Sequence, residues 1–532
     1  MTSSSGAAGP TPYRMSKEHQ RVFVGLMLGM LVASISQTIV GPGLPRIVAE
    51  LGGMEHYSWV ATAAMLVSAV AVPIVGKLSD LYGRKRFYVG GIVVFMVGSV
   101  ISGLAPNFWT LVAGRAVQGL GMGTLMPLSQ TIIGDIVPPR ARGKYQGFMG
   151  AIFGLTSVAG PLAGGVITDH LGWRWLFFAA LPFGLVTLFF IARFFHLPHT
   201  RREAKIDVAG IVTLTIALVA ILLATSWGGT TYAWSSSTIL GLYAVGAAFV
   251  ALFVRAELRA AEPVLPLRLF RSPVISWASV AAFGLAMVMF GAIIYIPVYA
   301  QGVLGVDATD SGLILMPMMV SFVVVGILAG LLVTRTGRYK PFMIAGVVVM
   351  GAGLWLLTQL GVDSSQTDMT VAMGVLGLGL GLCMQLYTLV VQNAVGPADM
   401  GVATASTQFF RNFGSTVGIA IFGTVMTSGL GAAITGHLPA GVAAKAGDAL
   451  SHANAGSALD PAAMEGMSSV VLSAVRAGLA DRLHDVFMLG LPVLAVVLVA
   501  TALIPHVPLR DTVHTREDAE RELLDTMGGA AR

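Results

Sequence analysis

Apolar residues run along this chain in long blocks that short polar stretches separate. Fourteen blocks are close to the length of about 20 residues that an α-helix needs to cross the hydrocarbon core of a bilayer. The pattern therefore predicts an all-α membrane protein with 14 transmembrane helices. The predicted helices cover residues 22–40, 59–75, 87–104, 111–133, 145–167, 175–195, 208–225, 239–254, 274–298, 312–333, 341–357, 371–391, 402–426 and 486–504.

The Lys and Arg residues between these blocks are unevenly divided between the two faces of the membrane. With the N-terminus in the cytoplasm, the cytoplasmic segments contain basic clusters around Lys77, Arg140, Arg201, Arg255 and Arg335. The opposite face receives only Arg46, Arg174, Lys445, Arg476 and Arg482. The positive-inside rule then predicts that both termini are cytoplasmic, and it supports an even number of helices.

Two similar stretches follow the second and the tenth predicted helices. Residues 76–84 read G-K-L-S-D-L-Y-G-R and residues 330–338 read G-L-L-V-T-R-T-G-R. Internal repeats in transporters indicate two related halves with a binding site between them near the midplane. We expect the following parts: six-helix halves at 22–195 and 255–504, an inserted pair (helices 7 and 8) within 196–254, cytoplasmic tails at 1–21 and 505–532, and a long extracellular loop at 427–485.

Composition supports the membrane assignment, since 55% of the 532 residues are hydrophobic and only 11% are charged. A soluble domain usually has about 25% charged residues. The net charge is +6, but no basic run with interleaved aromatic residues indicates nucleic acid binding. Cys383 is the only cysteine, so neither an intrachain disulfide nor a thiolate metal site is expected. The chain has no P-loop, H-E-x-x-H or nucleophile-elbow motif, so we expect no enzyme activity, no cofactor and no ATP-driven transport.

The stretch after the second helix contains glycines and charges that suit a tight connection between helices. Gly76 and Gly83 permit close backbone approach and a sharp turn. Arg84 can pair with a carboxylate, and Asp80 and Asp135 are the nearest candidates in the predicted arrangement. The stretch G-K-L-S-D-L-Y-G-R-K-R resembles the loop signature of the major facilitator superfamily. The resemblance implies a conformational latch at these residues, whereas the simpler interpretation is an ordinary basic loop.

The fourth predicted helix contains an arginine among apolar residues. Arg115 is followed one turn later by Gln118 and Gly119, and the stretch resembles a second signature of the same family. An arginine inside the membrane is costly and is usually paired or functional. We therefore name Arg115 and Gln118 as candidate transport residues. The alternative is that Arg115 extends its side chain to the outer interface.

The fifth predicted helix has a block of small residues around a proline. Gly160, Pro161, Gly164 and Gly165 resemble the signature that is characteristic of antiporters in this superfamily, although Thr156 replaces its first glycine. Small residues allow helices to approach closely, and proline bends a helix. The resemblance favours export over uptake. Ordinary close packing explains each glycine alone but not the whole block.

Further stretches at matching helices resemble the 14-helix drug:proton antiporter branch of the family, and the resemblance covers about residues 20–505. They include Q-T-I-V at 37–40, I-D-V-A-G at 206–210, Y-A-Q-G at 299–302 and F-F-R-N-F-G at 409–414. This resemblance implies a monomeric exporter in the bacterial plasma membrane. It implies a transport cycle of alternating access. It also implies proton antiport that moves small hydrophobic or amphiphilic molecules across the lipid bilayer and out of the cell.

One position departs from the pattern of that branch, which usually has Asp in the first helix where this chain has Ser36. All 26 acidic residues are expected in loops, tails or helix ends, so the site of proton coupling is uncertain, with Asp80 and Asp135 as the nearest candidates. Arg411 is expected about 13 Å inside the thirteenth helix. The cavity is therefore expected to be neutral or positive, and to favour neutral amphiphiles or anions over cations. The candidate substrate residues besides Arg115 and Gln118 are Gln37, Tyr299, Gln385 and Arg411.

Other functions remain open at this stage. Exporting one particular lipid or endogenous metabolite would fit the missing carboxylate in the first helix. A membrane receptor or scaffold that transports nothing is a third alternative, and uptake is a fourth. The G-P-x-x-G-G block argues against the last two.

Overall fold

The computed structural model describes residues 15–51, 59–195, 206–229, 232–306, 308–439 and 468–510. Within these residues the chain is almost entirely helical, and no β-strand occurs besides one isolated bridge between Gly228 and Tyr232. The all-α membrane fold expected from the sequence is thus confirmed. The helices of the first part are α1 (Lys17–Thr38), α2 (Leu44–Leu51), α3 (Trp59–Tyr82), α4 (Arg84–Gly103), α5 (Phe108–Ile136), α6 (Pro139–His170), α7 (Trp175–Phe178) and α8 (Ala180–Phe194).

The second part begins with the paired helices α9 and α10. Its helices are α9 (Val208–Trp227), α10 (Ser237–Glu257), α11 (Pro273–Gly302), α12 (Ala308–Thr336), α13 (Lys340–Thr358), α14 (Gln366–Asn393), α15 (Met400–Thr427), α16 (Leu430–Gly436) and α20 (Ser469–Leu503). Short 3₁₀ turns at Gly41–Gly43, Leu267–Arg271 and Pro397–Asp399 precede α2, α11 and α15.

Short polar residues start several of these helices, as helix N-caps require. The side chain of Asn107 accepts a hydrogen bond from Thr110 N at the start of α5, and Asp207 does the same for Gly210 N at the start of α9. Ser365 and Asp368 form a reciprocal capping box at the start of α14. Gly83, with φ of 101°, separates α3 from α4, because residues with a Cβ rarely adopt this conformation.

Thirteen helices are long and apolar enough to cross a membrane within the described residues. They coincide with thirteen of the fourteen predicted segments. The exception, α5, is a 29-residue helix at the fourth predicted segment, but it is not among those thirteen. Its sequence includes Arg115, Gln118, Thr124, Ser129 and Gln130, all buried in the protein and not facing lipid. The count of fourteen membrane helices therefore stays a prediction.

The predicted extracellular loop at 427–485 contains helical structure in its described residues, and its place outside the membrane stays a prediction. Helix α15 continues to Thr427, α16 follows directly, and α20 begins at Ser469. Asp481 and Asp485 thus lie within a helix, which also corrects the expectation that every acidic residue falls in a loop, a tail or a helix end. Their charges interrupted the apolar pattern and hid the first half of α20. Residues 440–467, which include Lys445, lie outside the described part, as do residues 196–205 with Arg201 and the tail from 511 onward.

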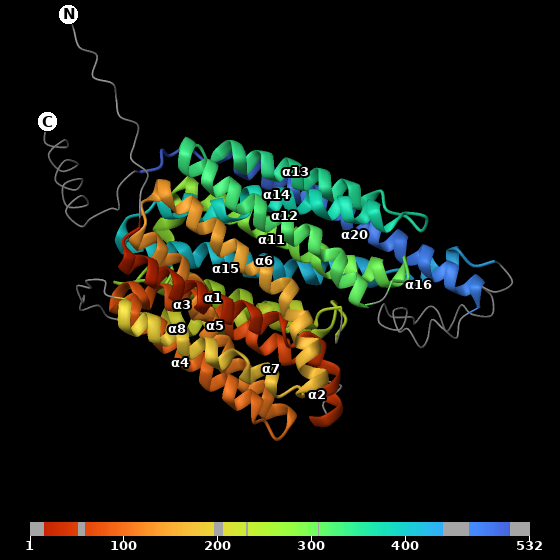
Figure 1. The fold of residues 1–532 in the computed structure, drawn as a ribbon, viewed down its shortest axis with the longest axis horizontal. Helices are drawn as coiled ribbons and strands as arrows, with labels where there is room; N and C mark the ends of the chain where they lie inside the picture. Colours follow the sequence, from red (N-terminus) through yellow and green to blue (C-terminus); the bar gives the residue numbers. More distant parts are fainter. Residues whose placement is uncertain are drawn as a thin grey trace, which may run out of the picture.

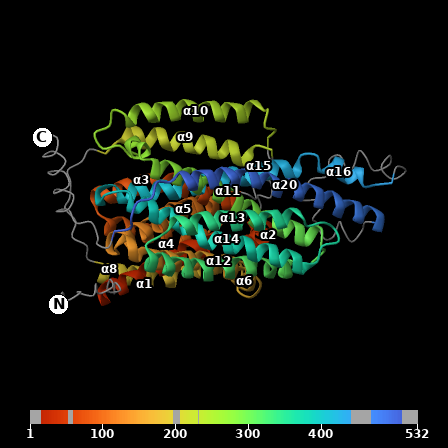
Figure 2. The same ribbon diagram turned by 90° about the horizontal axis from the view of Figure 1, so that it is seen from above.

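The helices run roughly parallel to one another, and the start of α1 and the end of α20 lie at the same end of the bundle (Figure 1). We call this the N/C end; it is where α1 begins and α20 finishes, and the other end is the opposite end. Helices α9 and α10 lie side by side along one flank, with α9 between α10 and the rest of the bundle (Figure 2). Helices α16 and α20 extend beyond the other helices at the opposite end (Figure 1).

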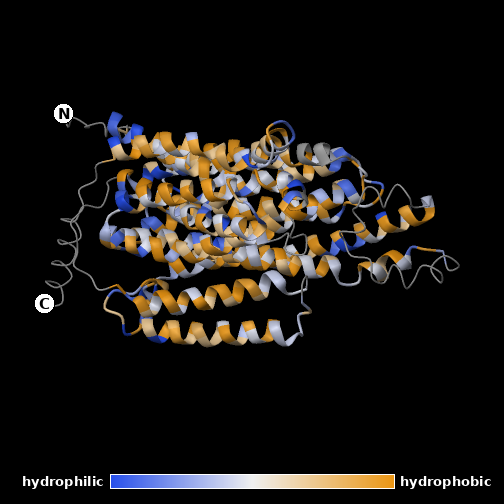
Figure 3. Cartoon of the chain, turned by 90° about the horizontal axis from the view of Figure 1, so that it is seen from below, coloured by the Kyte–Doolittle hydropathy of each residue, from blue (hydrophilic) through white to orange (hydrophobic). Residues whose placement is uncertain are grey.

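Buried apolar side chains form separate cores that follow the order of the chain. Two clusters draw only on residues between Met15 and Phe195, whereas the largest draws on residues from Leu214 to Leu509 and on Val70 of α3. Apolar residues also predominate along the outer helices (Figure 3). We call α1–α8 the first group and α11–α20 the second group. The division into two six-helix halves with an inserted pair remains a prediction that this grouping favours.

The two groups approach most closely where α6 crosses α12. A methyl group built on Gly143 would lie 2.7 Å from Gly330 O, and one on Gly147 would lie 2.8 Å from Gly326 O. Only glycine fits at such a crossing, because the backbones themselves are in contact. Both pairs lie in the N/C half of the bundle, so the groups are pressed together at that end.

Candidate transport site

A small cavity of about 50 Å³ lies between the two groups near the middle of the bundle. Helices α1, α5 and α6 line it from the first group, and α11, α14 and α15 from the second. We call it the central cavity. Its lining residues are Met30, Ser34, Gln37, Met126, Gln130, Met149, Phe153, Met289, Phe290, Met384, Gln385, Gln408, Arg411 and Asn412.

Arg411 is the charged side chain among these fourteen described lining residues. One of its nitrogens donates to Gln408 Oε1, and Gln408 Nε2 donates to Asn412 Oδ1 over 3.2 Å. The three residues recur at helical spacing, which puts them on one face of α15. The buried oxygens Gln130 Oε1 and Gln385 Oε1 have no hydrogen-bond partner among the described residues. Among the described lining residues the cavity thus offers one cation and two free acceptors, and none of them is a carboxylate.

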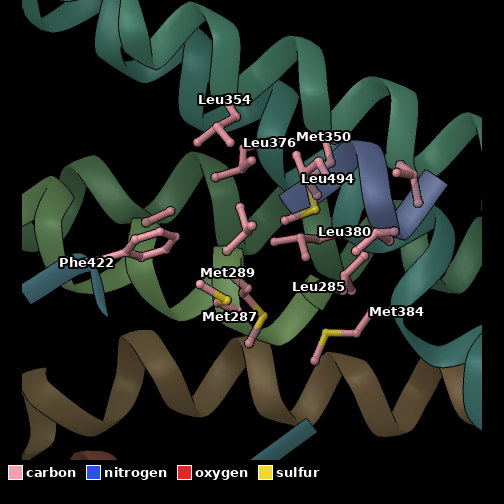
Figure 4. Packing of buried hydrophobic residues seen from close by; sticks show 14 of the residues in the cluster. Leu285, Met287, Met289, Met350, Leu354, Leu376, Leu380, Met384, Phe422 and Leu494 are labelled. Carbon is pink, nitrogen blue, oxygen red and sulfur yellow. The ribbon is translucent and has the colours of Figure 1, made fainter. Parts of the chain in front are cut away.

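Methionine side chains make up much of the remaining wall. Met289 of α11 and Met384 of α14 both line the cavity, and Met287 lies beside Met289 (Figure 4). Flexible thioether side chains adapt to ligands of varied shape. Met289 and Met384 therefore belong both to the core of the second group and to the cavity wall.

Three of the candidate substrate residues come together here, namely Gln37, Gln385 and Arg411. Arg115 lies elsewhere: its Nε donates to Val60 O over 2.9 Å, and another nitrogen lies 3.5 Å from Ser36 O. Arg115 also bonds Gln118 Oε1, and Gln118 donates to Ser99 Oγ over 2.8 Å. These bonds join α5 to α1, α3 and α4. Arg115 is satisfied inside the first group and does not extend to the outer interface.

Tyr299 is also outside the central cavity. Its side chain is 1% exposed, and its hydroxyl donates to Gly361 O over 2.7 Å. This bond connects the end of α11 to the turn between α13 and α14, within the second group. Neither the central cavity nor the interface between the groups contains this tyrosine.

The predicted latch residues meet at the N/C end. Arg84 Nε lies 2.9 Å from Asp135 Oδ2, and Arg84 also pairs with Asp80, so the suggested ion pair is present. Asp80 in turn accepts hydrogen bonds from Gly401 N and Val402 N over 3.1 and 2.9 Å.

This carboxylate completes a helix of the other group. Helix α15 has no side-chain cap of its own, and its first N–H groups need acceptors. Asp80 supplies them from α3, where its negative charge also meets the positive end of the α15 dipole. Gly76 makes room for the contact, since a methyl group there would lie 2.5 Å from Ala405 Cβ.

Sequence reasoning missed several polar bridges between the groups at this end. Lys77 Nζ lies 2.7 Å from Glu262 Oε2, in the linker before α11. Gln392 of α14 donates to Gln130 O of α5 over 3.0 Å, and Gln146 of α6 lies within 3.5 Å of it. Glutamines in the middle of apolar helices were the available signal for this set. Nothing in the sequence pairs Lys77 with a residue 185 positions away.

A C-terminal strap, residues 504–510, crosses the N/C end. Lys340 Nζ donates to Ile504 O over 2.8 Å, and Val507 N donates to the hydroxyl of Tyr339 over 2.8 Å. Burial raises the pKa of Tyr339, so this hydroxyl stays neutral. Asn393 Nδ2 donates to Pro508 O over 3.1 Å, and Arg140 N of α6 donates to Arg510 O over 3.0 Å. The strap thereby joins the two groups.

The glycine-proline block of α6 faces the end of α1. A methyl group on Gly160 would collide with Thr38 Oγ1, and one on Gly164 would collide with Ile39 O. Thr38 donates to Thr156 O over 2.9 Å. Pro161 is exposed, and Gly165 has no neighbour within 4 Å of an added methyl group. Half of the block therefore packs two helices together, while the other half faces outward.

Comparison with known proteins matches residues 26–419 to the family model of the Major Facilitator Superfamily. The chain is 38% identical to the multidrug transporter protein MdtP of Bacillus subtilis, over 93% of this chain and 96% of that protein. It is also 38% identical to multidrug resistance protein 3 of Bacillus subtilis, over 76% of this chain and 79% of that protein. The efflux pump aunC of Aspergillus niger is 35% identical, over 79% and 81% of the two chains.

Solved structures resemble the fold at low sequence identity. The proton:xylose symporter XylE superimposes with a TM-score of 0.60 at 14% identity, over 94% of this chain and 98% of that one. The human organic anion transporter MFSD10 superimposes with a TM-score of 0.58, also at 14% identity, over 90% of this chain and 100% of that one.

Proposed function

Because this chain belongs to the major facilitator superfamily, a family of membrane transporters and not of enzymes, we propose that it is a secondary active exporter of drug-like or amphiphilic small molecules. Its similarity to multidrug and efflux transporters supports export. The antiporter-like block at Gly160, Pro161, Gly164 and Gly165 supports export over uptake.

The observation that carries this proposal is a central cavity between two helix groups that are bound together on one side of it. The N/C end is closed by Asp80, Arg84, Asp135 and the strap, all through ion pairs and hydrogen bonds that can break and form again. Such an arrangement suits alternating access, in which the groups rock around a fixed midplane site. We assign Gly76, Asp80, Gly83, Arg84 and Asp135 as the conformational latch.

The orientation follows from the basic residues. The N/C end carries Arg84, Arg140, Arg255 and Arg335, so we place it in the bacterial cytoplasm under the positive-inside rule. The protein then acts as a monomer in the plasma membrane with the latch on the inner face. The closed latch corresponds to a state that exposes substrate outward.

The charge of the central cavity narrows the range of substrates that we expect it to bind. Arg411 attracts anions and repels cations, and Gln37 and Gln385 add neutral hydrogen-bonding groups. We therefore assign Gln37, Gln385 and Arg411 as substrate-binding residues for neutral or anionic amphiphiles. Arg115 and Gln118 connect α5 to α1, α3 and α4 within the first group, and Tyr299 fixes the far end of α11.

A second candidate function is export of one specific lipid or endogenous metabolite. Ser36 favours it, because this position lacks the carboxylate usual in drug:proton antiporters. Ser36 is 3% exposed, lies behind the cavity lining and offers its carbonyl to Arg115. If protons drive export here, Asp80 and Asp135 are our candidate coupling residues, since Asp80 contacts α15 of the second group and Asp135 pairs with Arg84 beside it.

Transport by purified protein in liposomes tests the proposal. A pH gradient is imposed in each direction, and movement of an anionic fluorophore, 8-anilinonaphthalene-1-sulfonate, is compared with that of the lipophilic cation ethidium. We expect gradient-dependent movement and preference for the anion. Stronger transport of ethidium would contradict the proposed substrate class.

Variants of Arg411 and of the acidic pair refine the same assay. Arg411→Ala should weaken the apparent affinity for the anion about tenfold, as loss of one hydrogen bond to a charged group predicts, whereas Arg411→Lys should retain most of it. Asp135→Asn should abolish the gradient dependence if this residue couples protons. Movement that never depends on the gradient would instead support facilitated export.

A further inference from the structure

A second and larger cavity, of about 350 Å³, lies near the opposite end between α3, α9, α11 and α15. We call it the flank cavity. It shares no lining residue with the central cavity, but both are built on α11 and α15. Ser415 Oγ and Thr416 Oγ1, which line the flank cavity, both donate to the carbonyl of Asn412, whose side chain lines the central one. The two cavities therefore follow one another along α15.

The paired helices complete the wall of the flank cavity. The turn that follows α9 places the ring of Trp234 against Gly228 and Gly229, where a side chain would collide with it. Trp234 Nε1 then donates to Thr424 Oγ1 of α15 over 2.9 Å. On the other side, Trp227 of α9 contacts Trp59 of α3, with ring centres 5.7 Å apart. Helix α9 is thus fastened to both groups around this space.

The lining of the flank cavity carries no charge among the described residues. Most of its hydroxyl groups already donate to their own helices, as Thr225 does to Ile221 O over 2.7 Å and Thr424 to Ala420 O over 2.9 Å. The surface is therefore largely apolar, with Met65, Leu66 and Ile419 among the contacts. A charged ligand would lose its hydration here and gain no counter-charge, so burying it would be unfavourable.

Tyr295 differs from those lining residues whose hydroxyl groups donate to their own helices. Its hydroxyl faces Gly423, where an added methyl group would lie 2.9 Å away, and no acceptor for it occurs among the described residues. The tyrosine is 9% exposed. A hydroxyl that faces a cavity and makes no hydrogen bond within the described residues can donate to a ligand that supplies an acceptor.

We propose that the flank cavity is a second binding site, which takes an uncharged lipophilic molecule whose carbonyl or ether oxygen accepts a hydrogen bond from Tyr295. The volume lies within the usual range for small-molecule sites, about 300–1,000 Å³. The inference rests on the proposed export function in one respect: in that function, the flank cavity would be an uncharged binding site between the central cavity and the opposite face. Binding itself does not require transport.

Photolabelling of the purified full-length protein with tritiated benzophenone tests this site, because the ketone is uncharged, accepts a hydrogen bond and reacts with nearby C–H bonds on irradiation. Mass spectrometry then identifies the labelled helices. We expect saturable labelling at Met65 or on α9 and α15 beyond Asn412. Gly423→Leu should fill the space and abolish this label. Tyr295→Phe should lower it about fivefold, the factor that one neutral hydrogen bond contributes.

Two matched variants serve as controls. Gly351→Leu adds the same side chain to α13, where no atom lies within 4 Å. Tyr387→Phe removes a buried hydroxyl that bonds Thr501 on the far side of the second group. Both should label like the wild type. Label confined to Met residues of the central cavity, or label that Gly423→Leu leaves unchanged, would overturn the proposal. Wild-type labelling without any transport would instead contradict the export function alone.

Discussion

Carboxylates accept hydrogen bonds at the two ends of this molecule, but they join different partners. At the N/C end, Asp80 of the first group holds the N-terminus of α15 in the second group. At the opposite end, Arg174 pairs with Glu50, and both belong to the first group. Similar chemistry thus binds the groups together at one end and stiffens a single group at the other.

The difference explains how one end can open while the fold persists. Separating the groups at the N/C end must break the contacts of Asp80, Lys77 and the strap, but it leaves each apolar core intact. Opening at the opposite end breaks none of these contacts of Asp80, Lys77 and the strap. In the proposed alternating-access cycle, we therefore expect variants at the N/C end to have the largest effects.

Gly330→Leu should have the largest effect. The added side chain would collide with Gly143 O, a backbone atom that cannot turn aside. Overpacking typically destabilises a protein by about 1–3 kcal/mol and occasionally by more. We expect a loss above that range here, because the clash is with backbone and also forces the groups apart. We expect transport to be lost and the melting temperature in detergent to fall. Gly351→Leu is the control on an open helix face; equal melting temperatures for the two variants would show that the crossing tolerates separation.

Arg84→Ala should follow. It leaves Asp80 and Asp135 without their counter-charge, and their side chains are only 4% and 19% exposed. Removing one partner of a buried pair costs about 3–5 kcal/mol, and partial exposure puts this site near the lower figure. In the Arg84→Ala background, a thiol reagent should label Thr404→Cys more than tenfold faster than in the wild-type background. The native Cys383 is fully buried, so it should not contribute to this signal. The exposed Arg86→Ala is the control, and an unchanged labelling rate in Arg84→Ala would argue against a latch.

Glu262→Gln should have a smaller effect of the same sign. It removes one charge from the bridge to Lys77 but leaves the size of the side chain unchanged. The Glu262 side chain is 32% exposed, so we expect a loss of about 0.5–1 kcal/mol in the stability of the closed end. Labelling at Thr404→Cys should then accelerate two- to fivefold, roughly as that energy predicts, with no change in melting temperature. An increase in labelling rate as large as that in Arg84→Ala would mean that the Lys77–Glu262 ion pair is the main contact that closes the N/C end.

Glu50→Gln at the opposite end should have the smallest effect. Both side chains of the pair are largely exposed, and such pairs contribute about 0–1 kcal/mol. Hydrogen bonds from Arg174 and Trp173 lower the pKa of Glu50, so its contribution is present above the unfolded-state pKa and is lost as pH falls through the folded one. Wild type and variant should differ slightly in melting temperature at pH 7 and converge in acid. A large loss of transport in Glu50→Gln would contradict the idea that charged contacts at the N/C end matter more than those at the opposite end.

Sequence reasoning found the membrane helices because an unbroken apolar run of bilayer length seldom occurs outside a membrane-spanning helix. It misjudged α20, where Asp481, Arg482 and Asp485 interrupt the apolar run although they lie within one continuous helix. It also found α5, whose polar residues exclude it from a purely hydropathic count.

The site was predicted in part, and the limits have physical reasons. Arg84 and Asp135 could be paired from the sequence because both stand at helix ends on the same face of the membrane. The position of Arg411 in an apolar helix indicated the central cavity. The burial of Arg115 among the carbonyls of other helices, and the approach of Gly143 to Gly330, depend on how helices far apart in sequence cross. No local pattern records such a crossing.

The C-terminal strap has a consequence for biogenesis. Domains and helices made first can fold while later ones are still being synthesised. Residues 504–510 leave the ribosome after every helix that they contact, so Arg140 N and the Asn393 side chain lack these partners until α20 has been inserted. A chain that stalls before α20 would differ from the finished protein at these polar groups. The contacts of the strap at the N/C end can therefore form only after α20 has been synthesised.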